Sequence, residues 1–342
     1  MTKAHASKLS VAYVMPVRND ASYLRAAVES IIAQDNPPKT AIVLSVGPSL
    51  DNTREVADEL AKEYGVTVVD NPQGNTPAAL NIALLATNAD VAVRVDAHSE
   101  LSPGYAQNAV RILEETGASN VGGIMEARGR TNIQKAVAWA YGNFIGLGGG
   151  PIHTGGTAGP ADTVYLGVFR RLDVIEIGGF NERLIRGQDW ELNARLRESG
   201  RTVWFDPSLR VGYYPRRDIA SLARQFFSTG SFRAYILLAN PKRTRAKYLV
   251  PPAFLASLIV GAIALVFSGS WWMLLPGYAY ATLVTVGALT AKGLSVRSRI
   301  ALLAVLPTMH VSWGLGFWKG VVTFSSREDD VVLNTAAISV HS

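Results

Sequence analysis

The sequence predicts an α/β domain of the Rossmann-like type, followed by a C-terminal α-helical membrane region. Short apolar runs of strand length alternate with stretches of helical spacing through roughly the first hundred residues. Alternation of this kind is typical of a parallel sheet covered by helices. Three long apolar stretches in the last third of the 342 residues predict the second part.

The first half of the chain supplies the expected sheet. Ligands of such sheets bind outside the carboxyl ends of the strands, so we expect functional residues in the loops that follow them. Asp51 and Thr53 stand where the second helix is expected to begin, and Thr76 with Pro77 stands at the start of the third. The expected strands are 11–15, 41–46, 66–69 and 91–95, and the expected helices are 22–32, 53–64 and 77–86.

A looser pattern follows over residues 120–215, with a strand at 163–169 and a helix at 190–198. We interpret it as the second half of the same domain, which therefore extends over 1–217. Its glycine-rich stretch, 146–159, lacks the G-x-x-x-x-G-K-S/T pattern of a phosphate loop. A mobile lid and a plain flexible connector are the two interpretations of this stretch.

The basic residues are concentrated before the first apolar stretch. Nine of them lie between Arg210 and Lys247, against the single acid Asp218. A nucleic-acid binder would spread its basic residues over a folded face, whereas basic residues beside an apolar segment are typical of contact with anionic lipid headgroups. We therefore expect a membrane partner and no nucleic acid, with a solvated charged face as the alternative. The absence of cysteine excludes disulfides and thiolate metal sites.

The apolar stretches 249–267, 271–291 and 300–324 each approach the 20 or so residues that a membrane span needs. We expect an interfacial segment at 218–248, about three transmembrane helices within 249–324 and a polar tail at 325–342. Basic loops before the first stretch and after the second place the N-terminal domain in the cytoplasm of a multi-pass cell-membrane protein, with the tail on the opposite side. Helices buried in a larger soluble core are the alternative. His310, within the third stretch, is expected to bond a neighbouring helix.

Asp96 and His98 carry the first chemical signal, because they follow the fourth expected strand. A strand-end carboxylate with a second ligand two residues later can hold Mg²⁺ or Mn²⁺ beside a diphosphate, whose oxygens would complete the coordination shell. The alternatives are a turn-forming aspartate and a histidine that bonds a phosphate or a backbone group.

Asp189 and Trp190 carry the second signal, at the start of an expected helix. An aspartate beside an aromatic platform suits a general base that acts on a sugar hydroxyl. Trp190 offers the apolar face against which pyranose rings stack. Ordinary helix capping by Asp189, with Trp190 in the core, is the alternative.

Five motifs in one order resemble the family 2 glycosyltransferases, which have a GT-A fold, and among them the succinoglycan-type sugar transferases with a membrane-anchored C-terminus. The motifs are VMPVRN at 14–19, TPAALNIA at 76–83, VDAH at 95–98, GGFNE at 178–182 and QD at 188–189. The resemblance implies Asp189 as the catalytic base, with Asp96 and His98 at the metal. It also implies nucleotide-sugar contacts by Pro16, Val17, Arg18, Asn19, Ser45, Gly47, Asp51, Asn81, Arg94 and Asp96, and acceptor contacts by Trp190, Gln188 and Thr163.

The chain departs from the family pattern at three places. Residues 44–48 read LSVGP where the family carries an acidic residue that contacts uracil, so both UDP- and GDP-sugars stay open as donors. His98 replaces a second aspartate of the metal motif. Gln188 replaces an acid before the base, which removes one charge that would raise the pKa of Asp189.

The resemblance implies an inverting transferase that moves a sugar from a nucleotide-sugar to a polyprenyl-linked or glycolipid acceptor at the membrane. Residues 225–233 only echo the Q-x-x-R-W motif of processive relatives, so one sugar is expected per encounter. Arg224 and Arg233 then contact either the diphosphate or lipid headgroups. A polyprenyl-phosphate sugar synthase and a non-catalytic membrane scaffold are the alternatives. A Rossmann dehydrogenase is disfavoured because no G-x-G-x-x-G follows the first strand.

Overall fold

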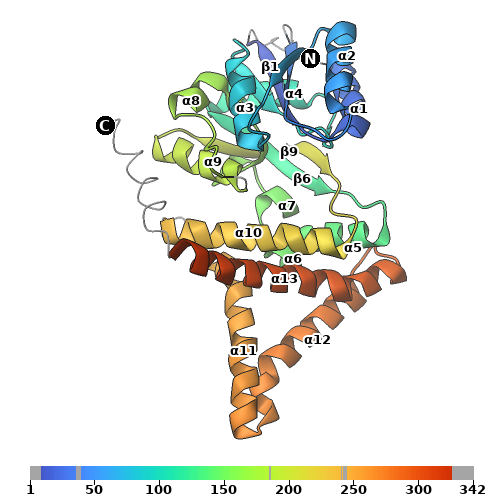
Figure 1. Cartoon of the computed structure of the whole chain (residues 1–342), viewed down its shortest axis with the longest axis vertical. Helices are drawn as coiled ribbons and strands as arrows, with labels where there is room; N and C mark the ends of the chain where they lie inside the picture. The colour runs from blue at the N-terminus through green and yellow to red at the C-terminus, as the bar shows by residue number, and fades with distance from the viewer. Residues whose placement is uncertain (1–8, 36–39, 185, 240, 242–244, 326–342) are drawn as a thin grey trace. The chain divides into compact units, whose positions relative to one another are not determined.

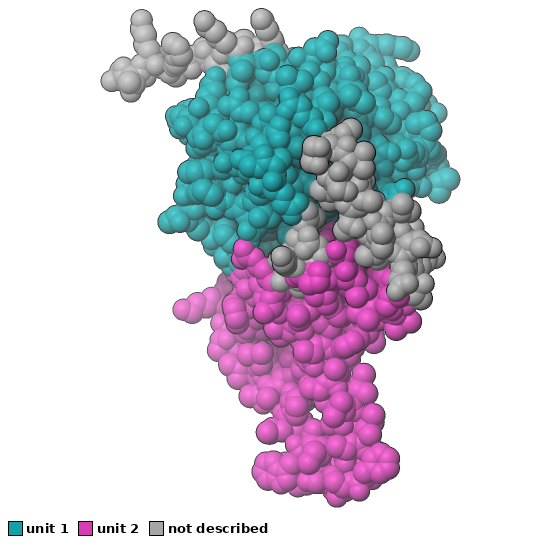
Figure 2. All heavy atoms as spheres, turned by 90° about the vertical axis from the view of Figure 1, so that its left-hand side faces the viewer, with its two compact units in different colours: residues 1–126, 150–214 teal, residues 127–149, 215–342 magenta. Residues whose placement is uncertain are grey.

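The computed structural model describes residues 9–35, 40–184, 186–239, 241 and 245–325. The chain divides into two compact units, which Figure 2 shows in different colours. The first unit comprises residues 1–126 and 150–214, and the second comprises 127–149 and 215–342. The polar tail expected at 325–342 lies outside the described residues except for Ser325.

A mixed sheet forms the centre of the first unit, with nine strands among the described residues. Its order is β3-β2-β1-β4-β8-β6-β9-β5, and β7 pairs with β9. The strands β1 to β4 run parallel, while β8 is antiparallel to both β4 and β6. The strands are β1 (Val11–Val17), β2 (Thr40–Val46), β3 (Thr67–Asp70), β4 (Val91–Arg94), β5 (Glu100–Leu101), β6 (Asn120–Ala127), β7 (Gly159–Pro160), β8 (Tyr165–Arg170) and β9 (Val203–Tyr213).

Helices cover both faces of this sheet, and each face has its own apolar core. Alternate residues of β1 serve the two cores: Tyr13 and Met15 enter one, and Val14 enters the other. The first core lies under α1 (Ala21–Ile32), α2 (Thr53–Tyr64) and α4 (Tyr105–Thr116), and the second under α3 (Thr76–Leu85), α8 (Arg171–Glu176) and α9 (Gln188–Glu198). Figure 1 shows these two helical layers with the sheet between them. A short helix, α7 (Pro151–Thr154), also belongs to this unit.

The expected α/β organisation is confirmed, since every strand and helix predicted in the first hundred residues is present within a few residues of its predicted bounds. The start of α3 differs slightly. Asn75, rather than Thr76, is the capping residue, because its side chain accepts a hydrogen bond from the backbone nitrogen of Ala78 at 2.9 Å. Pro77 then occupies the first turn, where its missing donor costs nothing.

The second unit is entirely helical among the residues that are described. In Figure 1, α10 and α13 lie side by side, and α11 and α12 project away from them as a hairpin. The helices are α5 (Asn132–Tyr141), α6 (Phe144–Leu147), α10 (Ile219–Ala239), α11 (Val250–Ser268), α12 (Leu275–Thr290) and α13 (Val296–Ser325), with single 3₁₀ turns at Ala246–Leu249 and Trp271–Leu274.

The division of the chain into units differs from the expected one at residues 127–149. They pack with the second unit instead of the first. The reason is local to α5. The Ser298 hydroxyl donates to the side-chain oxygen of Asn132 at 3.1 Å, and the Gln134 side chain donates to the carbonyl of Pro215 at 2.9 Å. The glycine-rich stretch 146–159 is therefore divided between the two units, so its interpretation as one lid stays a prediction.

Three helical segments of the described chain are long and apolar enough to cross a membrane, as expected. They are Ala246–Ser268, Trp271–Thr290 and Val296–Ser325. His310 lies in the third and bonds neighbouring elements at both ring nitrogens, as the sequence predicted. Its Nδ1 lies 2.8 Å from the hydroxyl of Tyr280 on α12, and its Nε2 lies 3.0 Å from the carbonyl oxygen of Gly146. This arrangement fixes the tautomer with the proton on Nε2.

Glycines set the close approach of α10 and α13, which gives a direct test of the packing. A Cβ at Gly316 would overlap the carbonyl oxygen of Phe227, so we expect Gly316→Ala to cost about 1–3 kcal/mol through overpacking. The matched control is Gly277→Ala on α12, where the added Cβ would lie 3.4 Å from a methyl carbon of Leu258, an ordinary contact distance. There the better helix propensity of alanine should leave stability unchanged or raised. Thermal unfolding of both variants in detergent measures the difference, and equal midpoints would contradict this packing.

Candidate functional site

The topology of the sheet places its ligand-binding crevice at the carboxyl ends of β1 and β4, where the strand order reverses. The order runs β3-β2-β1 and then passes to β4, so these two ends lie side by side. The backbone nitrogen of Val95 donates to the carbonyl of Val14 at 3.1 Å across them. Open α/β sheets bind ligands at this reversal point. Pro16 and the buried Val17 end β1 here, and Asp96 follows β4.

Arg18 and Asn19 tie together the loops that follow the first three strands. The Arg18 guanidinium donates to the carbonyls of Pro48 and Gly74 at 3.2 and 3.0 Å. Asn19 adopts a left-handed conformation with φ of 55°, and its side-chain oxygen accepts from the backbone nitrogen of Leu50 at 2.7 Å. Both side chains therefore shape the rim of the crevice, and contact with a nucleotide stays a prediction for them.

The segment after β2 is closely packed. Gly47 is buried, and a Cβ there would lie 3.1 Å from the Cα of Gly74, so the glycine permits the close approach of two loops. Ser45 is fully buried within β2, away from solvent. Asp51 accepts backbone hydrogen bonds at 3.2 Å from the first residues of α1 and α2. Asp51 thus caps the starts of both helices, the role that its position in the sequence suggests.

Arg94 joins the two carboxylates that the sequence singled out. Its side chain, only 5% exposed, donates to Asp96 Oδ1 from Nε at 3.3 Å and from Nη2 at 3.2 Å. Its Nη1 forms a short ion pair with Asp189 Oδ1. Two carboxylates far apart in the chain, Asp96 and Asp189, are therefore held on one guanidinium at the reversal point of the sheet.

Asp189 lies in the first turn of α9 but does not cap it. The capping position is Gly187, whose φ of 72° requires glycine or a strained residue. The Asp189 side chain instead turns to Arg94 and stays 31% exposed. The side chain of Asp189 therefore does not cap the helix, unlike in the capping alternative. Its place in the first turn lets the helix dipole stabilise the ionised carboxylate.

Burial raises the pKa of Asp189 above the usual aspartate value, and the positive charge of Arg94 opposes this rise. Asp96 adds to the rise through like-charge repulsion. The result is a carboxyl group that is easier to protonate than an ordinary surface aspartate.

Asp20 is a member of the site that the sequence did not single out. Burial raises its pKa, a hydrogen bond from the Arg18 backbone and the charge of His98 lower it, and Asp96 raises it further. These mutual effects place Asp20, at the end of the β1 loop, in the electrostatic field of Asp96 and His98. Its position directly after the VMPVRN motif at 14–19 was the only available signal.

Asp96 and His98 are the residues that could hold a divalent metal. Asp96 is partly exposed and has one oxygen on Arg94, while His98 is exposed two residues later. Over the described residues, no three His, Cys, Asp or Glu side chains are grouped as a metal site. The donor set therefore fits a metal only if ligand oxygens, such as those of a diphosphate, supply most of the shell.

Asn81 brackets the Gly-Gly-Phe-Asn-Glu turn. Its side-chain nitrogen donates to the Phe180 carbonyl at 2.8 Å and to Glu182 at 2.9 Å, and its oxygen accepts from the Phe180 nitrogen at 2.7 Å. Gly179, with φ of 70°, is needed because a Cβ there would lie 2.6 Å from the Asn81 oxygen. These bonds give Asn81 a positioning role, and its expected nucleotide contact stays a prediction.

Arg195 fixes the same turn from α9 and was missed in the sequence. Its guanidinium donates to the carbonyls of Ile177 and Gly179 at 2.7 and 2.6 Å, and it pairs with Glu191 at 2.7 Å. The helix that carries Asp189 is thereby attached to the turn before it. Sequence spacing identifies the Glu191–Arg195 pair but not its backbone partners.

The expected acceptor residues lie around α9. Gln188 is its first residue, and Trp190 is partly buried in its first turn. Thr163 accepts a hydrogen bond from the side chain of Asn193 at 2.9 Å, on the inner face of the helix. Asn193 in turn accepts from Asn120 of β6 at 2.6 Å, so Thr163 belongs to a buried polar chain that seats α9 on the sheet.

Arg224 and Arg233 belong to α10, in the second unit. Arg224 is exposed and donates to the Ser221 hydroxyl at 2.8 Å. Arg233 lies over the Tyr248 ring, 3.9 Å from its centre, a cation–π contact. Their expected contact with a diphosphate stays a prediction.

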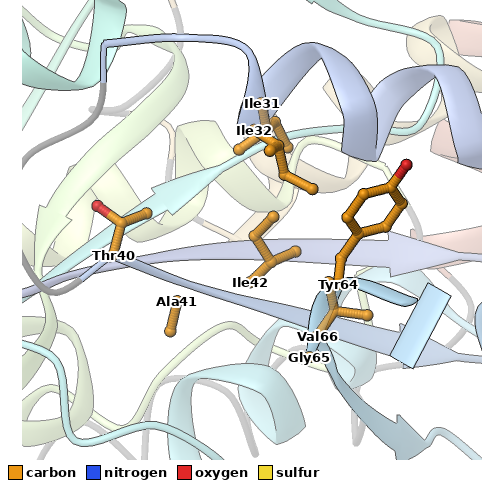
Figure 3. Close-up of a pocket in the computed structure, with 8 residues that line it drawn as sticks. All are labelled: Ile31, Ile32, Thr40, Ala41, Ile42, Tyr64, Gly65 and Val66. Carbon is orange, nitrogen blue, oxygen red and sulfur yellow. The ribbon is translucent and has the colours of Figure 1, made fainter. Parts of the chain in front are cut away.

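A small cavity of about 240 Å³ lies at the amino end of β2 (Figure 3). Apolar side chains of Ile31, Ile32, Ile42 and Val66 line it, with Tyr64 at one side. It is at the opposite end of the strand from Gly47. Its lining offers little to a charged ligand, so the candidate site is the polar crevice and not this cavity.

Comparison with known proteins finds one matching family model and several similar proteins. Residues 13–173 match the family model described as Glycosyl transferase family 2. The chain is similar to the succinoglycan biosynthesis protein ExoA of Rhizobium meliloti, with 29% identity over 332 residues that cover 96% of this chain and 99% of that protein. It is also similar to the pre-mycofactocin glycosyltransferase of Mycobacterium tuberculosis, with 23% identity over 94% of this chain and 64% of that protein.

Solved structures share the fold. A mannosyltransferase from Pyrobaculum calidifontis, in complex with GDP-Man and Mn²⁺, superposes with a TM-score of 0.58 at 19% identity, covering 92% of this chain and 88% of its own. The fragment of S. aureus TarS that comprises its residues 1–349 superposes with a TM-score of 0.50 at 13% identity, covering 91% of this chain and 92% of the fragment. These likenesses establish the GT-A architecture of the α/β unit.

The bracket at Asn81 gives a stability prediction. Asn81→Ala leaves the Phe180 amide and carbonyl without their side-chain partner, and each buried group left unpaired costs about 1–3 kcal/mol. Gln73→Ala is the matched control, because the exposed Gln73 also bonds Glu182 but holds no backbone group of the turn. We expect a clearly lower unfolding midpoint only for the Asn81 variant, with faster proteolysis at the 178–182 turn. Similar midpoints for both variants would remove the bracket role.

Proposed function

We propose, on the match of residues 13–173 to the family model described as Glycosyl transferase family 2, that this chain is a membrane-attached, inverting glycosyltransferase. It moves a sugar from a nucleotide-sugar to a lipid-linked or membrane-proximal saccharide acceptor, in the assembly of a polysaccharide or glycolipid. The observation that carries the proposal is the pair of carboxylates on Arg94: Asp96 at the strand end and Asp189 in the first turn of α9.

The crevice at β1 and β4 supports a nucleotide-sugar donor, because ligands of such sheets bind at this reversal point. The similar mannosyltransferase is described with GDP-Man and Mn²⁺, and the similar ExoA is described as a succinoglycan biosynthesis protein. The likeness to ExoA favours a polysaccharide product. The segment after β2 supplies no carboxylate for uracil before Asp51, so we keep UDP- and GDP-sugars as equal candidates.

Asp189 is the proposed base. It removes the proton of the acceptor hydroxyl as the oxygen attacks the anomeric carbon on the face opposite the diphosphate, so that one displacement inverts the configuration. Arg94 fixes the orientation of the carboxylate. Trp190, in the same helical turn, is the proposed platform for the acceptor ring and excludes water from the reacting centre.

Asp96 and His98 would hold Mg²⁺ or Mn²⁺ together with oxygens of the diphosphate. The metal, when bound, supplies positive charge to the departing diphosphate. Arg94 already neutralises part of the charge of Asp96 and Asp189, so the three side chains together carry one net negative charge when both acids are ionised. This net charge attracts a divalent cation. Before the cation binds, the positive charge of Arg94 compensates the repulsion between the two carboxylates.

The helices of the second unit support membrane attachment, with the catalytic unit on the cytoplasmic side. Three segments have the length and composition to cross a bilayer. Basic residues flank them, with the Arg210–Lys247 block before the first and Lys292, Arg297 and Arg299 after the second. Basic flanks of this kind are retained in the cytoplasm.

Asp189→Asn tests the base in membranes supplied with radiolabelled UDP- and GDP-sugars. The amide keeps the shape but takes no proton, so we expect transfer to fall about 10²–10⁴-fold while donor binding persists. Glu198→Gln, at the exposed far end of the same helix, is the control and should keep full transfer. Retained transfer by the Asp189 variant would exclude it as the base. No labelled lipid or saccharide from any donor with the unaltered protein would remove the proposed function, and label on polyprenyl phosphate alone would select the synthase alternative.

Arg94→Met tests the electrostatics through the pH dependence of transfer. The base works only when ionised, so activity falls as the pH drops through its pKa. Arg94 lowers the pKa of Asp189, and its removal should therefore move the acidic limb of kcat/KM upward by about 1–3 pH units. Arg94→Lys keeps the charge and should move the limb much less. An unchanged limb in the Met variant would show that the observed titration does not belong to Asp189.

A further inference from the structure

The third apolar helix, α13, has different surroundings from α11 and α12. In its most apolar window 39% of the residues are buried, against 11% and 17% in the other two segments. It is also the longest helix: 30 residues at 1.5 Å each give about 45 Å, whereas a bilayer core is about 30 Å thick. Length and burial both set α13 apart from an ordinary span.

The parallel partner of α13 is α10, at backbone contact. A Cβ at Gly320 would lie 2.7 Å from the Ser231 carbonyl, and one at Gly316 would overlap the Phe227 carbonyl. One turn further along, the rings of Tyr235 and Phe324 meet at 5.4 Å. Contacts that advance together in steps of four residues mean parallel axes. The two helices therefore lie at the same membrane depth.

That shared depth argues against α13 as a span, because α10 would have to cross with it. Within Ile219–Ala239, all of it described, α10 carries Arg224, Gln225 and Arg233 and has no exposed large apolar side chain. An arginine at the bilayer centre costs about 2.5–3.5 kcal/mol even on the lowest scale. The N-terminal half of α13 is likewise bonded to the polar start of α5, through Ser298 and Asn132.

The free face of α13 is nevertheless apolar. Its exposed large apolar side chains recur at intervals of three or four residues near both ends, on one side of the helix, and Arg297 and Lys319 are also exposed near these ends. The apolar residues are Val296, Ile300, Leu303, Leu315, Trp318 and Val322. The buried residues that face α10 and α5 lie on the other side. A helix with one apolar face exposed and the opposite face packed on protein can lie flat in the headgroup region, with its exposed apolar face toward the acyl chains.

The hairpin of α11 and α12 leaves α13 from this same apolar face. A Cβ at Gly314 of α13 would lie 3.0 Å from the Pro251 carbonyl oxygen and 3.2 Å from the Leu255 side chain of α11, and the Trp318 indole donates to the Pro252 carbonyl at 3.0 Å. Figure 1 shows the hairpin projecting across the direction of α13. If the hairpin enters the bilayer, α13 lies along its surface.

The hairpin is long enough to cross. The 19 residues of α11 extend about 28 Å, close to the thickness of the core. Its flanks expose Val260, Val266 and Phe267. Trp271 and Trp272 stack at 4.0 Å just after the turn at its tip, the position of interfacial aromatics.

We propose that the second unit contacts the bilayer through two elements, the α11–α12 hairpin, which crosses it, and the apolar stripe of α13, which lies in the interface on the catalytic side. The inference rests on the proposed membrane attachment. The four residues 215–218 reach at most about 14 Å, so the unit before them and α10 are on one side. With two crossings instead of three, Ser325 returns to the side of the catalytic unit, whereas the sequence predicted it on the opposite side.

The chain has no cysteine, so single-cysteine variants report membrane sidedness without background. Ser199→Cys marks the α/β unit, Ser268→Cys the tip of the hairpin and Ser325→Cys the end of α13, and all three positions are exposed. Each full-length variant is labelled with a membrane-impermeant maleimide in right-side-out and in inverted vesicles. We expect Ser199→Cys and Ser325→Cys to react from one face and Ser268→Cys from the other.

Two results would overturn the proposal. Ser325→Cys that reacts from the face opposite to Ser199→Cys means that α13 crosses the membrane. Ser268→Cys that reacts from the Ser199 face, or from neither face, means that the hairpin does not cross. Recovery of all three variants in the soluble fraction would instead remove the membrane attachment itself. The labelling needs no sugar transfer, so its outcome is independent of the proposed catalytic reaction.

Discussion

The guanidinium of Arg94 is the interaction on which the candidate site depends. It is buried at the end of the central strand β4, and it forms ion pairs with the carboxylates of Asp96 and Asp189. Leaving a buried charge without its partners lowers the folding stability by about 3–5 kcal/mol. The stability of the fold therefore depends on the contacts of Asp96 and Asp189 with Arg94. The same contact opposes the effect of burial on the Asp189 pKa. Arg94 therefore acts on both the position and the proton affinity of the proposed base.

The surrounding structure maintains this contact by fixing α9. Arg195 binds the carbonyls of the turn before the helix, Asn81 binds the amide and carbonyl of Phe180, and Asn193 links the helix to β6 through Asn120. Each bond is polar and directional, so each restricts rotation or sliding of the helix more than apolar packing alone does. The Gly-Gly-Phe-Asn-Glu turn is in this view a support for Asp189 and not itself a binding loop.

Sequence patterns predicted the parallel half of the sheet well, because each strand and helix there is determined by local periodicity. They also placed Asp96 and Asp189 at element ends, where ligand-binding residues of such folds occur. The ion pair between Arg94 and Asp189 could not be predicted, since it joins residues 95 positions apart. Asn81, Ser45 and Asp51 resemble family nucleotide contacts, but the structure shows one bracketing a turn, one buried in a strand and one at two helix starts. Motif identity does not reveal such hydrogen-bond partners.

Apolar composition is equally incomplete as a guide to membrane topology. A helix becomes apolar on every side when it has lipid on every side, but also when one face meets lipid and the other meets a protein core. α13 fits the second description: Leu302, Val305 and Met309 are buried against neighbouring helices, while Ile300 and Leu303 are exposed. Averaging hydropathy over its sequence merges the two faces and produces the signal of a span. The partner helix α10 distinguishes the two cases, because its arginines disfavour a position at the bilayer centre for both helices.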